Sequence, residues 1–597
     1  MARTLREYKL LFVVLFIIVF SIYALSPFLA HLNGRFPFLS GADGEFYVLR
    51  LKSALLGDST LSCPFDPHLK SELTFVTSKM EYLWASLLKL FIGQNIHLAV
   101  VLTYLVLPGL VFVLLVYTIH KLFVRPFLAL ILGFFGVVDG SVYYWKLFSA
   151  GSVEIVEPLP YFRFANPMLF IIPFILAFAG FFYIVIQNAK RDTYVYLGSK
   201  GHFTLFVIFL GGFLFYDQIF YALYFVMTLG VFALLCAIQG KRKQFDLTAI
   251  VLLGVLLVGL PSLIESIDLV STPGMLDVLN RVGLLVSTPQ AYFTFHKGLI
   301  FTFVAYQFAC WNERNIRWKF LTAAMIAGYL CLNQSFVTGV SNHDQHYFRP
   351  LMITYLFVLA DFLTRVSEWV PHWIQNRYFK WPAAVVIICL VSGFGAWRVF
   401  QLADQSFAKD SYSLSSNRFE KTLATLKGMP VDEKGIILAD PALTYPIEVI
   451  TDHWSYIHPY YYECIVPDDL LFKRWSFLGK VFGWDHQEVS AFLTKFIKDS
   501  SLPYWLFGLP ASFAGEKNKY NSLSLELRKK VWTESYDSIT LKDVVEEQHK
   551  TGVVPRYLLK SPGYEPDFKV LKPLFSWKLL FEVPEERTSL WAITPRN

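Results

Sequence analysis

Charged residues are scarce in this chain of 597 residues: Asp, Glu, Lys and Arg make up 17% of it, whereas hydrophobic residues make up 55%. Soluble domains of ordinary composition carry about 25% charged residues, so this composition argues against a typical soluble protein. Apolar runs such as 10–32, 98–117 and 383–399 approach or exceed the roughly 20 residues that cross a bilayer as a helix. The sequence therefore predicts a polytopic membrane protein.

Cysteine is also rare, with six residues and no C-x-x-C pair or His-rich metal-ligand spacing. This absence argues against zinc-ribbon and thioredoxin-like chemistry. Four of the cysteines fall within predicted membrane spans, where small apolar packing explains them. Cys63 and Cys464 lie outside the spans, and their spacing leaves open whether they form a disulfide.

The apolar runs predict an α-helical protein with about eleven transmembrane helices. We place these spans near residues 10–32, 97–119, 126–145, 166–186, 203–218, 219–239, 247–264, 298–311, 320–337, 351–363 and 381–401. The first run follows three basic residues but is longer than the apolar core of a signal peptide, roughly 7–15 residues. We interpret it as a retained signal anchor.

The charges are distributed unevenly between the loops. With the N-terminus in the cytoplasm, the cytoplasmic segments hold 17 Lys or Arg against 5 Asp or Glu, and the opposite loops hold 9 against 11. This excess follows the positive-inside rule, and it accounts for the formal net charge of +7. No external segment carries a basic stripe, so we expect no nucleic-acid partner. We expect a multi-pass protein of a bacterial or archaeal cell membrane.

Hydropathy falls after the last span, which predicts two domains: a transmembrane domain, 1–401, with a first external loop at 33–96, and an extracytoplasmic α/β domain, 402–597. In the second domain, Lys434–Pro441 predicts a short buried strand. Residues Leu470–Ser500 predict amphipathic helices that break near Gly483. Two later segments, VPRYLLKSP and WKLLFEVPEERTSLWAI, predict strands, and the second folds into a hairpin that turns at Pro584–Arg587.

The first external loop contains the segment DGEFYVLRLKSALLG, which places Asp43 and Glu45 two residues apart. From Glu45 onward, apolar residues alternate with Arg50, Lys52 and Ser53, as in a helix that rests its apolar face on a bilayer. Such a helix would begin near Gly44 and hold Asp43 at its N-terminal end. A purely structural explanation is also open, because acids at a helix N-terminus favour the helix dipole.

A second polar cluster, TGVSNHDQHYFRPLM, lies between spans nine and ten on the same side of the membrane as Asp43. It contains His343, Asp344, His346 and Arg349. A solvated loop would also explain these residues, with Arg349 extending to the interface. In a functional role, the planar guanidinium of Arg349 suits a phosphate oxygen.

Two further ionisable residues lie at the outer ends of spans, namely Arg163 before span four and Asp217 between spans five and six. Charges at membrane depth are costly, so such residues are functional candidates. We add both to the predicted substrate-binding set.

Taken together, the N-terminal span, the long first external loop with its DGEFYVLRLKSALLG segment, the dozen or so spans and the external C-terminal domain resemble the GT-C superfamily of membrane glycosyltransferases. That superfamily includes the oligosaccharyltransferase catalytic subunit, the protein O-mannosyltransferases and the lipid A aminoarabinose transferases. The resemblance covers the chain as architecture and only this one segment as a motif. Residues Asp452–Ile457 match the Trp-Trp-Asp-Tyr-Gly motif of oligosaccharyltransferases only weakly, so Asn-linked transfer is not supported.

The resemblance implies transfer of a sugar from a polyprenyl-phosphate or polyprenyl-pyrophosphate carrier to a glycan, lipid or protein acceptor on the outer face. Asp43 would act as the base that accepts the acceptor's proton. Alternatively, Asp43 and Glu45 would bind Mg or Mn, which would neutralise the leaving phosphate. Arg349 and Arg163 would hold the lipid phosphate, with His343 or His346 as auxiliary donors.

Other classes of protein remain open at this point. A lipid-linked polysaccharide polymerase or ligase of another fold would place its catalytic groups in a late external loop, where the cluster around Arg349 lies. A transporter or flippase would be expected to show internal hydropathy repeats, and the sequence shows none. A non-catalytic scaffold would not need Asp43.

Overall fold

A computed structural model describes most of the chain. It covers residues 8–32, 44–57, 79–138, 166–190, 200–271, 297–311, 314–334, 347–369, 385–386, 389, 393, 418–429, 435–457, 468–496, 523–551 and 554–596. The chain divides into two compact units. The helical unit comprises Met1–Tyr47, Phe75–Ser266 and Leu285–Ala408, and the C-terminal unit comprises Val48–Thr74, Ile267–Leu284 and Lys409–Asn597. The predicted boundary near residue 402 falls outside the described residues and stays a prediction.

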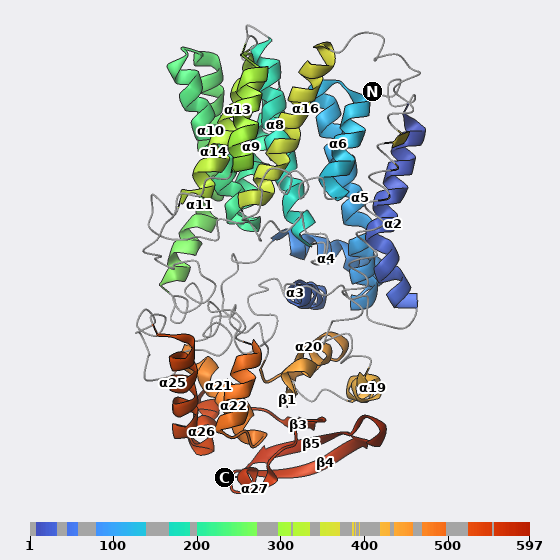
Figure 1. Ribbon diagram of the computed structural model, residues 1–597, viewed down its shortest axis with the longest axis vertical. Helices are drawn as coiled ribbons and strands as arrows, with labels where there is room; N and C mark the ends of the chain where they lie inside the picture. The colour runs from blue at the N-terminus through green and yellow to red at the C-terminus, as the bar shows by residue number, and fades with distance from the viewer. Residues whose placement is uncertain are drawn as a thin grey trace. The chain divides into compact units, whose positions relative to one another are not determined.

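The helical unit is a bundle whose long helices run alongside one another (Figure 1). Its described helices are α2 (Lys9–Leu32), α4 (Lys79–Ile92), α5 (Ile96–Phe123), α6 (Pro126–Val138), α8 (Asn166–Ala189), α9 (Gly201–Asp217), α10 (Ile219–Ile238), α11 (Arg242–Val270, whose last turn belongs to the C-terminal unit), α13 (Lys297–Ala309), α14 (Ile316–Leu332) and α16 (Phe348–Trp369). A described helix overlaps each of the first ten predicted spans, although α6 ends at Val138 and α14 at Leu332, before the predicted ends of their spans. The eleventh span lies mostly outside the described residues, so the total of about eleven stays a prediction.

Four described helices are long and apolar enough to cross a membrane: Ile96–Phe123, Met168–Ala189, Ile219–Ile238 and Arg242–Asp268. Shorter apolar helices cover Lys9–Ser21, Pro126–Val137, Gly201–Asp217 and Ile300–Ala309. On α11, Leu253, Leu257, Leu260 and Ile264 are all exposed, and their helical spacing places them on one face. A continuous exposed apolar face suits contact with lipid, and the chain is a multi-pass membrane protein.

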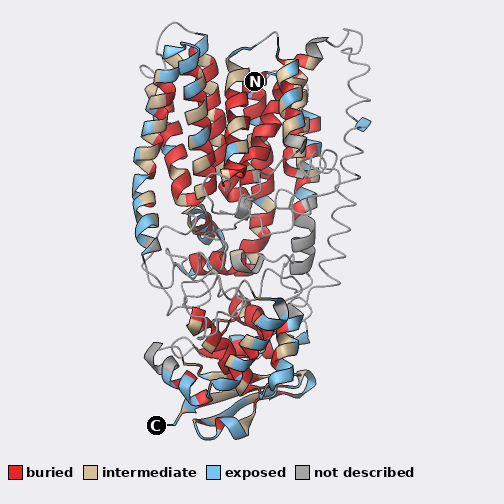
Figure 2. Cartoon of the chain, turned by 60° about the vertical axis from the view of Figure 1, so that its left-hand side comes forward, coloured by how far each residue is buried: buried red, intermediate tan, exposed pale blue. Residues whose placement is uncertain are grey.

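Inside the bundle, helices pack through aromatic rings and glycines, and buried residues fill its centre (Figure 2). The ring of Phe320 on α14 stacks on Phe182 of α8 with centroids 4.7 Å apart. A Cβ at Gly259 of α11 would lie 2.2 Å from the Phe215 ring of α9. Only glycine therefore permits this approach of α9 to α11, as is common between membrane helices.

Helix α3 (Gly44–Leu56) begins at the predicted residue, but the predicted amphipathic character is wrong. Arg50 and Ser53, expected on a polar face, are buried together with the apolar residues around them. From Val48 onward α3 belongs to the C-terminal unit, where Lys52 binds a neighbouring helix. The polar face is therefore covered by protein, which a periodicity argument cannot detect.

The C-terminal unit contains a five-stranded mixed sheet with strand order β2-β1-β3-β5-β4. Its strands are β1 (Ile436–Leu438), β2 (Trp454–Ser455), β3 (Tyr557–Lys560), β4 (Phe575–Val583) and β5 (Thr588–Pro595). Strand β1 pairs in parallel with β2 and β3, whereas β5 pairs antiparallel with β3 and β4. The predicted buried strand and the predicted hairpin are thus confirmed. The hairpin turns through Pro584–Glu586 and through Arg587, whose φ is 54°.

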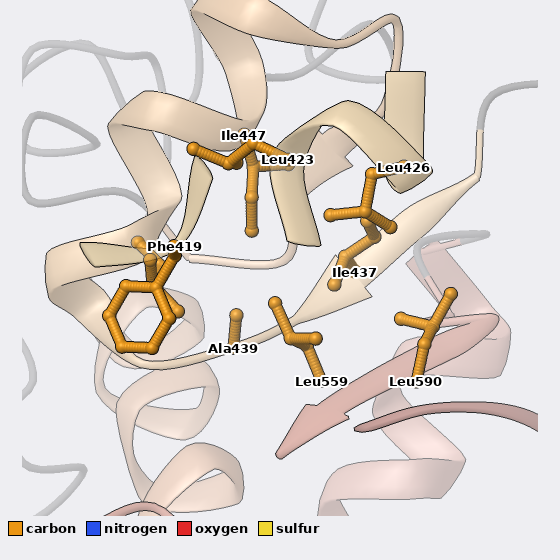
Figure 3. Packing of buried hydrophobic residues seen from close by; sticks show 9 residues of the cluster. Phe419, Leu423, Leu426, Ile437, Ala439, Ile447, Leu559 and Leu590 are labelled. Carbon is orange, nitrogen blue, oxygen red and sulfur yellow. The ribbon is translucent and has the colours of Figure 1, made fainter. Parts of the chain in front are cut away.

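Helices cover this sheet: α19 (Glu420–Gly428), α20 (Pro441–Ile450), α21 (Asp468–Val481), α22 (His486–Phe496), α25 (Leu525–Ser538), α26 (Leu541–Thr551) and α27 (Phe568–Leu571). As predicted, α21 and α22 are separated at Gly483, which has a φ of 69°. Leu423 and Leu426 of α19 and Ile447 of α20 pack on Ile437 and Leu559 of the sheet (Figure 3). This core fixes the position of α20, which matters for the contacts of α3.

Candidate functional site

The junction between α9 and α10 holds a buried acid. Helix α9 ends at Asp217, and Gln218 has extended backbone angles (φ −150°, ψ 103°) before α10 begins. The Asp217 side chain is 8% exposed. A carboxylate at a helix C-terminus is disfavoured by the helix dipole, so its position requires compensation from nearby groups.

Tyr221 lies one helical turn after Asp217, where residues i and i+4 share a face. The tyrosine is buried, and its ring contacts Phe174 of α8 with centroids 5.7 Å apart. Its hydroxyl is within electrostatic reach of both the Arg349 guanidinium and the Asp217 carboxylate. An arginine and an acid that are distant in sequence therefore meet at one tyrosine.

Arg349 reaches this tyrosine from the first turn of α16, where it is half-buried. The chain before it is fixed by Tyr347, whose ring meets Phe220 of α10 edge to face at 5.3 Å. This contact seats the start of α16, which carries Arg349, against α10, which carries Tyr221.

Tyr47 adds a third element to this site. It lies within electrostatic reach of Tyr221, and its ring is 6.5 Å from that of Phe170 on α8. Tyr47 stands in the first turn of α3, two residues after Glu45 in the sequence. We call Tyr47, Asp217, Tyr221 and Arg349 the Tyr221 cluster.

The Tyr221 cluster combines one cation, one anion and two hydroxyl groups. A half-buried guanidinium can donate two parallel hydrogen bonds to a phosphate, and tyrosine hydroxyls can donate further ones. Asp217 can accept a hydrogen bond and offset the positive charge when no anion is bound. Such a set is suited to binding an anionic headgroup at the end of membrane helices.

The structure brings together two of the predicted site residues, Asp217 and Arg349. The predicted residues outside the described part of the chain are Asp43, Arg163, His343, Asp344 and His346. The backbone of Glu45 lies in the first turn of α3, and its side chain is not among those described. Their roles stay predictions.

Sequence reasoning missed Tyr47 and Tyr221. Two sequence features pointed to these residues. Tyr221 follows Asp217 at a spacing of four residues, and Tyr47 lies within the segment DGEFYVLRLKSALLG. Neither clue separates these residues from the many other tyrosines of the chain, 32 in total.

Among the described residues, no group of three His, Cys, Asp or Glu side chains lies close enough to hold a metal ion. The predicted ligands for Mg or Mn, Asp43 and Glu45, are not part of that set because their side chains are not described. Of the cysteines assigned to spans, Cys236, Cys310 and Cys331 are buried, as the packing interpretation predicts, whereas Cys389 is exposed. Cys63 and Cys464 lie outside the described residues.

No protein-family model and no curated protein matches this sequence. Among solved structures, the chain is similar to the oligosaccharyltransferase from Archaeoglobus fulgidus in complex with Zn and sulfate, with 12% identity and a TM-score of 0.47 over 83% of this chain and 70% of that one. It is also similar to the oligosaccharyltransferase AglB from the same organism, in complex with an inhibitory peptide and a dolichol-phosphate (12% identity, TM-score 0.47, 99% and 74% covered).

A third similar structure is ArnT from Cupriavidus metallidurans bound to undecaprenyl phosphate, with 12% identity and a TM-score of 0.42 over 98% of each chain.

Proposed function

We propose that this protein transfers a glycosyl group from a polyprenyl-phosphate or polyprenyl-pyrophosphate carrier to an acceptor at the outer face of the membrane. The observation that supports this most directly is the Tyr221 cluster. There a half-buried arginine, a buried acid and Tyr47 of the first turn of α3 lie within electrostatic reach of Tyr221. A headgroup site next to an acidic segment is what transfer from a lipid phosphate requires.

In the proposed reaction, Arg349 and Tyr221 bind the phosphate of the donor and hold its anomeric carbon toward Asp43. The Asp43 carboxylate accepts the proton of the acceptor hydroxyl as the oxygen attacks that carbon. The bond between the carbon and the phosphate oxygen breaks, and the carrier phosphate leaves with the bonding electron pair. Arg349 stabilises the charge that develops on the phosphate, where a preorganised donor is most effective.

The test uses the full chain in lipid nanodiscs, incubated with radiolabelled polyprenyl-phosphate and polyprenyl-pyrophosphate sugars and a membrane extract as the source of acceptors. Asp43→Asn is expected to abolish transfer, with expression and thermal unfolding unchanged. Retained transfer by this variant would remove the catalytic assignment. Loss of activity on chelation, restored by Mg or Mn, would indicate the metal-ligand role for Asp43 rather than the base role.

The role of Arg349 has its own test. Arg349→Ala is expected to raise the apparent KM for the donor at least tenfold, with little change in the KM for the acceptor, because the guanidinium contacts only the phosphate. The matched control is Arg242→Ala, which removes an arginine whose side chain is 90% exposed. An Arg349→Ala protein with the wild-type donor KM would contradict the phosphate-binding role.

A further inference from the structure

Arg314, which lies between α13 and α14 in the chain, contacts two tryptophan rings of the helical unit. Its guanidinium carbon is 4.6 Å from the ring centroid of Trp311 and 5.4 Å from that of Trp318. At such distances a guanidinium is attracted to the face of an indole ring. The indole N–H of Trp318 in turn donates a hydrogen bond to Gln307 Oε1 of α13 at 2.9 Å. Contacts with both helices therefore hold Arg314 in place.

The cations around Trp318 lack acidic partners. The guanidinium of Arg317 lies over the ring of Phe123, and Lys319 lies within electrostatic reach of a second lysine, Lys241. In the described part of the chain, neither these three cations nor Arg314 forms an ion pair with an acid. An aromatic ring accepts no conventional hydrogen bond, so the guanidinium N–H groups remain able to bind a phosphate in a bidentate manner.

Helix α13 presents an apolar stripe that leads to Arg314. Phe301, Val304 and Phe308 are 58%, 42% and 71% exposed, and their spacing places them on one face of the helix. The stripe covers about 10 Å of the helix axis, within the roughly 15 Å of hydrocarbon in one leaflet. Trp311, which is 63% exposed, follows the stripe, and tryptophan is enriched at the boundary between hydrocarbon and headgroups. The stripe and the arginine match the acyl chain and the phosphate of one lipid.

This site is separate from the Tyr221 cluster. Helix α10 carries Tyr221 in its first turn, and Lys241, which lies near Lys319, follows its last turn. A helix of this length spans about 30 Å, which is also the thickness of the hydrocarbon core. The two groups of residues therefore lie toward opposite ends of a membrane-spanning helix, and an anion bound near Arg314 is a different molecule from the donor proposed above.

We propose that Arg314 and the α13 stripe form a binding site for one anionic phospholipid, with the phosphate on Arg314 and an acyl chain along Phe308, Val304 and Phe301. A small soluble anion would use the cations but leave the stripe uncovered. A zwitterionic phospholipid would bring a positive group to a surface that already holds four cations, and the two indole rings that attract such a group already contact Arg314. The inference does not rest on the proposed function.

The first experiment is native mass spectrometry of the full chain, titrated with phosphatidylglycerol or with phosphatidylcholine of the same acyl chains. We expect the wild type to bind its first phosphatidylglycerol at least tenfold more tightly than its first phosphatidylcholine. Arg314→Gln is expected to lose at least tenfold in affinity for phosphatidylglycerol and to keep its affinity for phosphatidylcholine. Equal wild-type affinities for the two lipids would overturn the proposal.

The matched control is Arg418→Gln, which removes an exposed arginine that lies over the ring of Phe419 in the C-terminal unit. This variant is expected to bind phosphatidylglycerol as the wild type does, and a loss equal to that of Arg314→Gln would overturn the assignment to Arg314. Arg314→Lys keeps the charge but not the planar fork, and it is expected to retain a preference for phosphatidylglycerol. If Arg314→Gln does not fold, the comparison of Arg314→Lys with the wild type decides, and an unchanged affinity would overturn the bidentate role.

The second experiment separates a lipid from a free anion. Phe308→Asn is expected to weaken both phospholipids at least threefold, because the stripe contacts the acyl chain and not the headgroup. Millimolar inorganic phosphate is expected to leave the bound phosphatidylglycerol in place. Displacement by inorganic phosphate together with a wild-type affinity in Phe308→Asn would identify a site for small anions and overturn the lipid assignment. Phosphatidylglycerol is also expected to raise the apparent unfolding temperature of the wild type more than that of Arg314→Gln, since a ligand of the folded state stabilises it, and equal shifts would contradict the site.

Discussion

The buried ammonium of Lys52 makes the stability of the C-terminal unit depend on pH in a calculable way. In the unfolded chain the amine has its ordinary pKa of 10.5, whereas in the folded protein burial lowers the pKa to about 8. Between these two values the unfolded chain binds more protons than the folded protein, so the free energy of unfolding rises with pH. Below pH 8 both states are protonated, and the full penalty for burying the charge is present.

A pKa difference of this size corresponds to about 3 kcal/mol, because each unit is worth about 1.4 kcal/mol. The Lys52→Met variant has no amine at this position and therefore lacks this contribution. We expect the wild-type protein to gain about 3 kcal/mol of unfolding free energy relative to the variant between pH 7.5 and pH 10.5. This difference holds whatever Lys52→Met does to packing, because packing contributes equally at both pH values.

The assay is urea unfolding of the full chain in nanodiscs, followed by tryptophan fluorescence at pH 7.5, 9 and 10.5. Asp452→Asn removes a carboxylate that raises the pKa of Lys52, so this variant is expected to begin its rise in stability at lower pH than the wild type. The reasoning is refuted if the difference between wild type and Lys52→Met stays constant within about 0.5 kcal/mol, or if it changes in the opposite direction.

Two further predictions concern stability. Asp361 accepts a hydrogen bond from buried Arg365 at 2.9 Å. Asp361→Ala is expected to lower the free energy of unfolding by about 3–5 kcal/mol, measured by thermal unfolding in detergent, because it leaves a buried charge unpaired. Adding Arg365→Met is expected to recover part of this loss, and no recovery would mean that the unpaired charge is not its cause. Glu586 accepts hydrogen bonds from backbone amides at the start of α19, including that of Thr422 at 2.9 Å. Glu586→Ala is expected to lower the unfolding free energy of the C-terminal unit by about 1–2 kcal/mol, whereas the exposed control Glu585→Ala is expected to leave it unchanged, and equal losses would contradict the capping role.

Features that depend on neighbouring residues were predictable from the sequence. The hydropathy of the apolar runs predicted the four described helices that are long and apolar enough to cross a membrane, because a helix that contacts lipid must satisfy its backbone internally and be apolar along its length. The turn at Pro584–Arg587 predicted the hairpin, because the turn residues and the alternating strands are adjacent in the chain. The start of α3 at Gly44 followed from the acidic residues before an apolar run.

Features that depend on which surfaces meet were not predictable. The sequence predicts that the polar face of α3 is exposed. In the structure, however, Lys52 of this face donates hydrogen bonds to the backbone carbonyl oxygens of Glu448 and Thr451. Arg349 and Asp217 were both recognised as outward-facing charges, but nothing in the sequence indicated that they share Tyr221.

The sequence by itself determined that this chain spans a membrane, that it carries an α/β domain after its last apolar run, and that an acidic segment follows its first helix. These properties arise from composition and short-range periodicity, which act on each segment alone. Only the tertiary structure decided that Asp217, Tyr221 and Arg349 form one cluster and that Lys52 binds the end of α20. Those contacts join residues that are distant in the chain, and their energies depend on burial and geometry that exist only once the helices have packed.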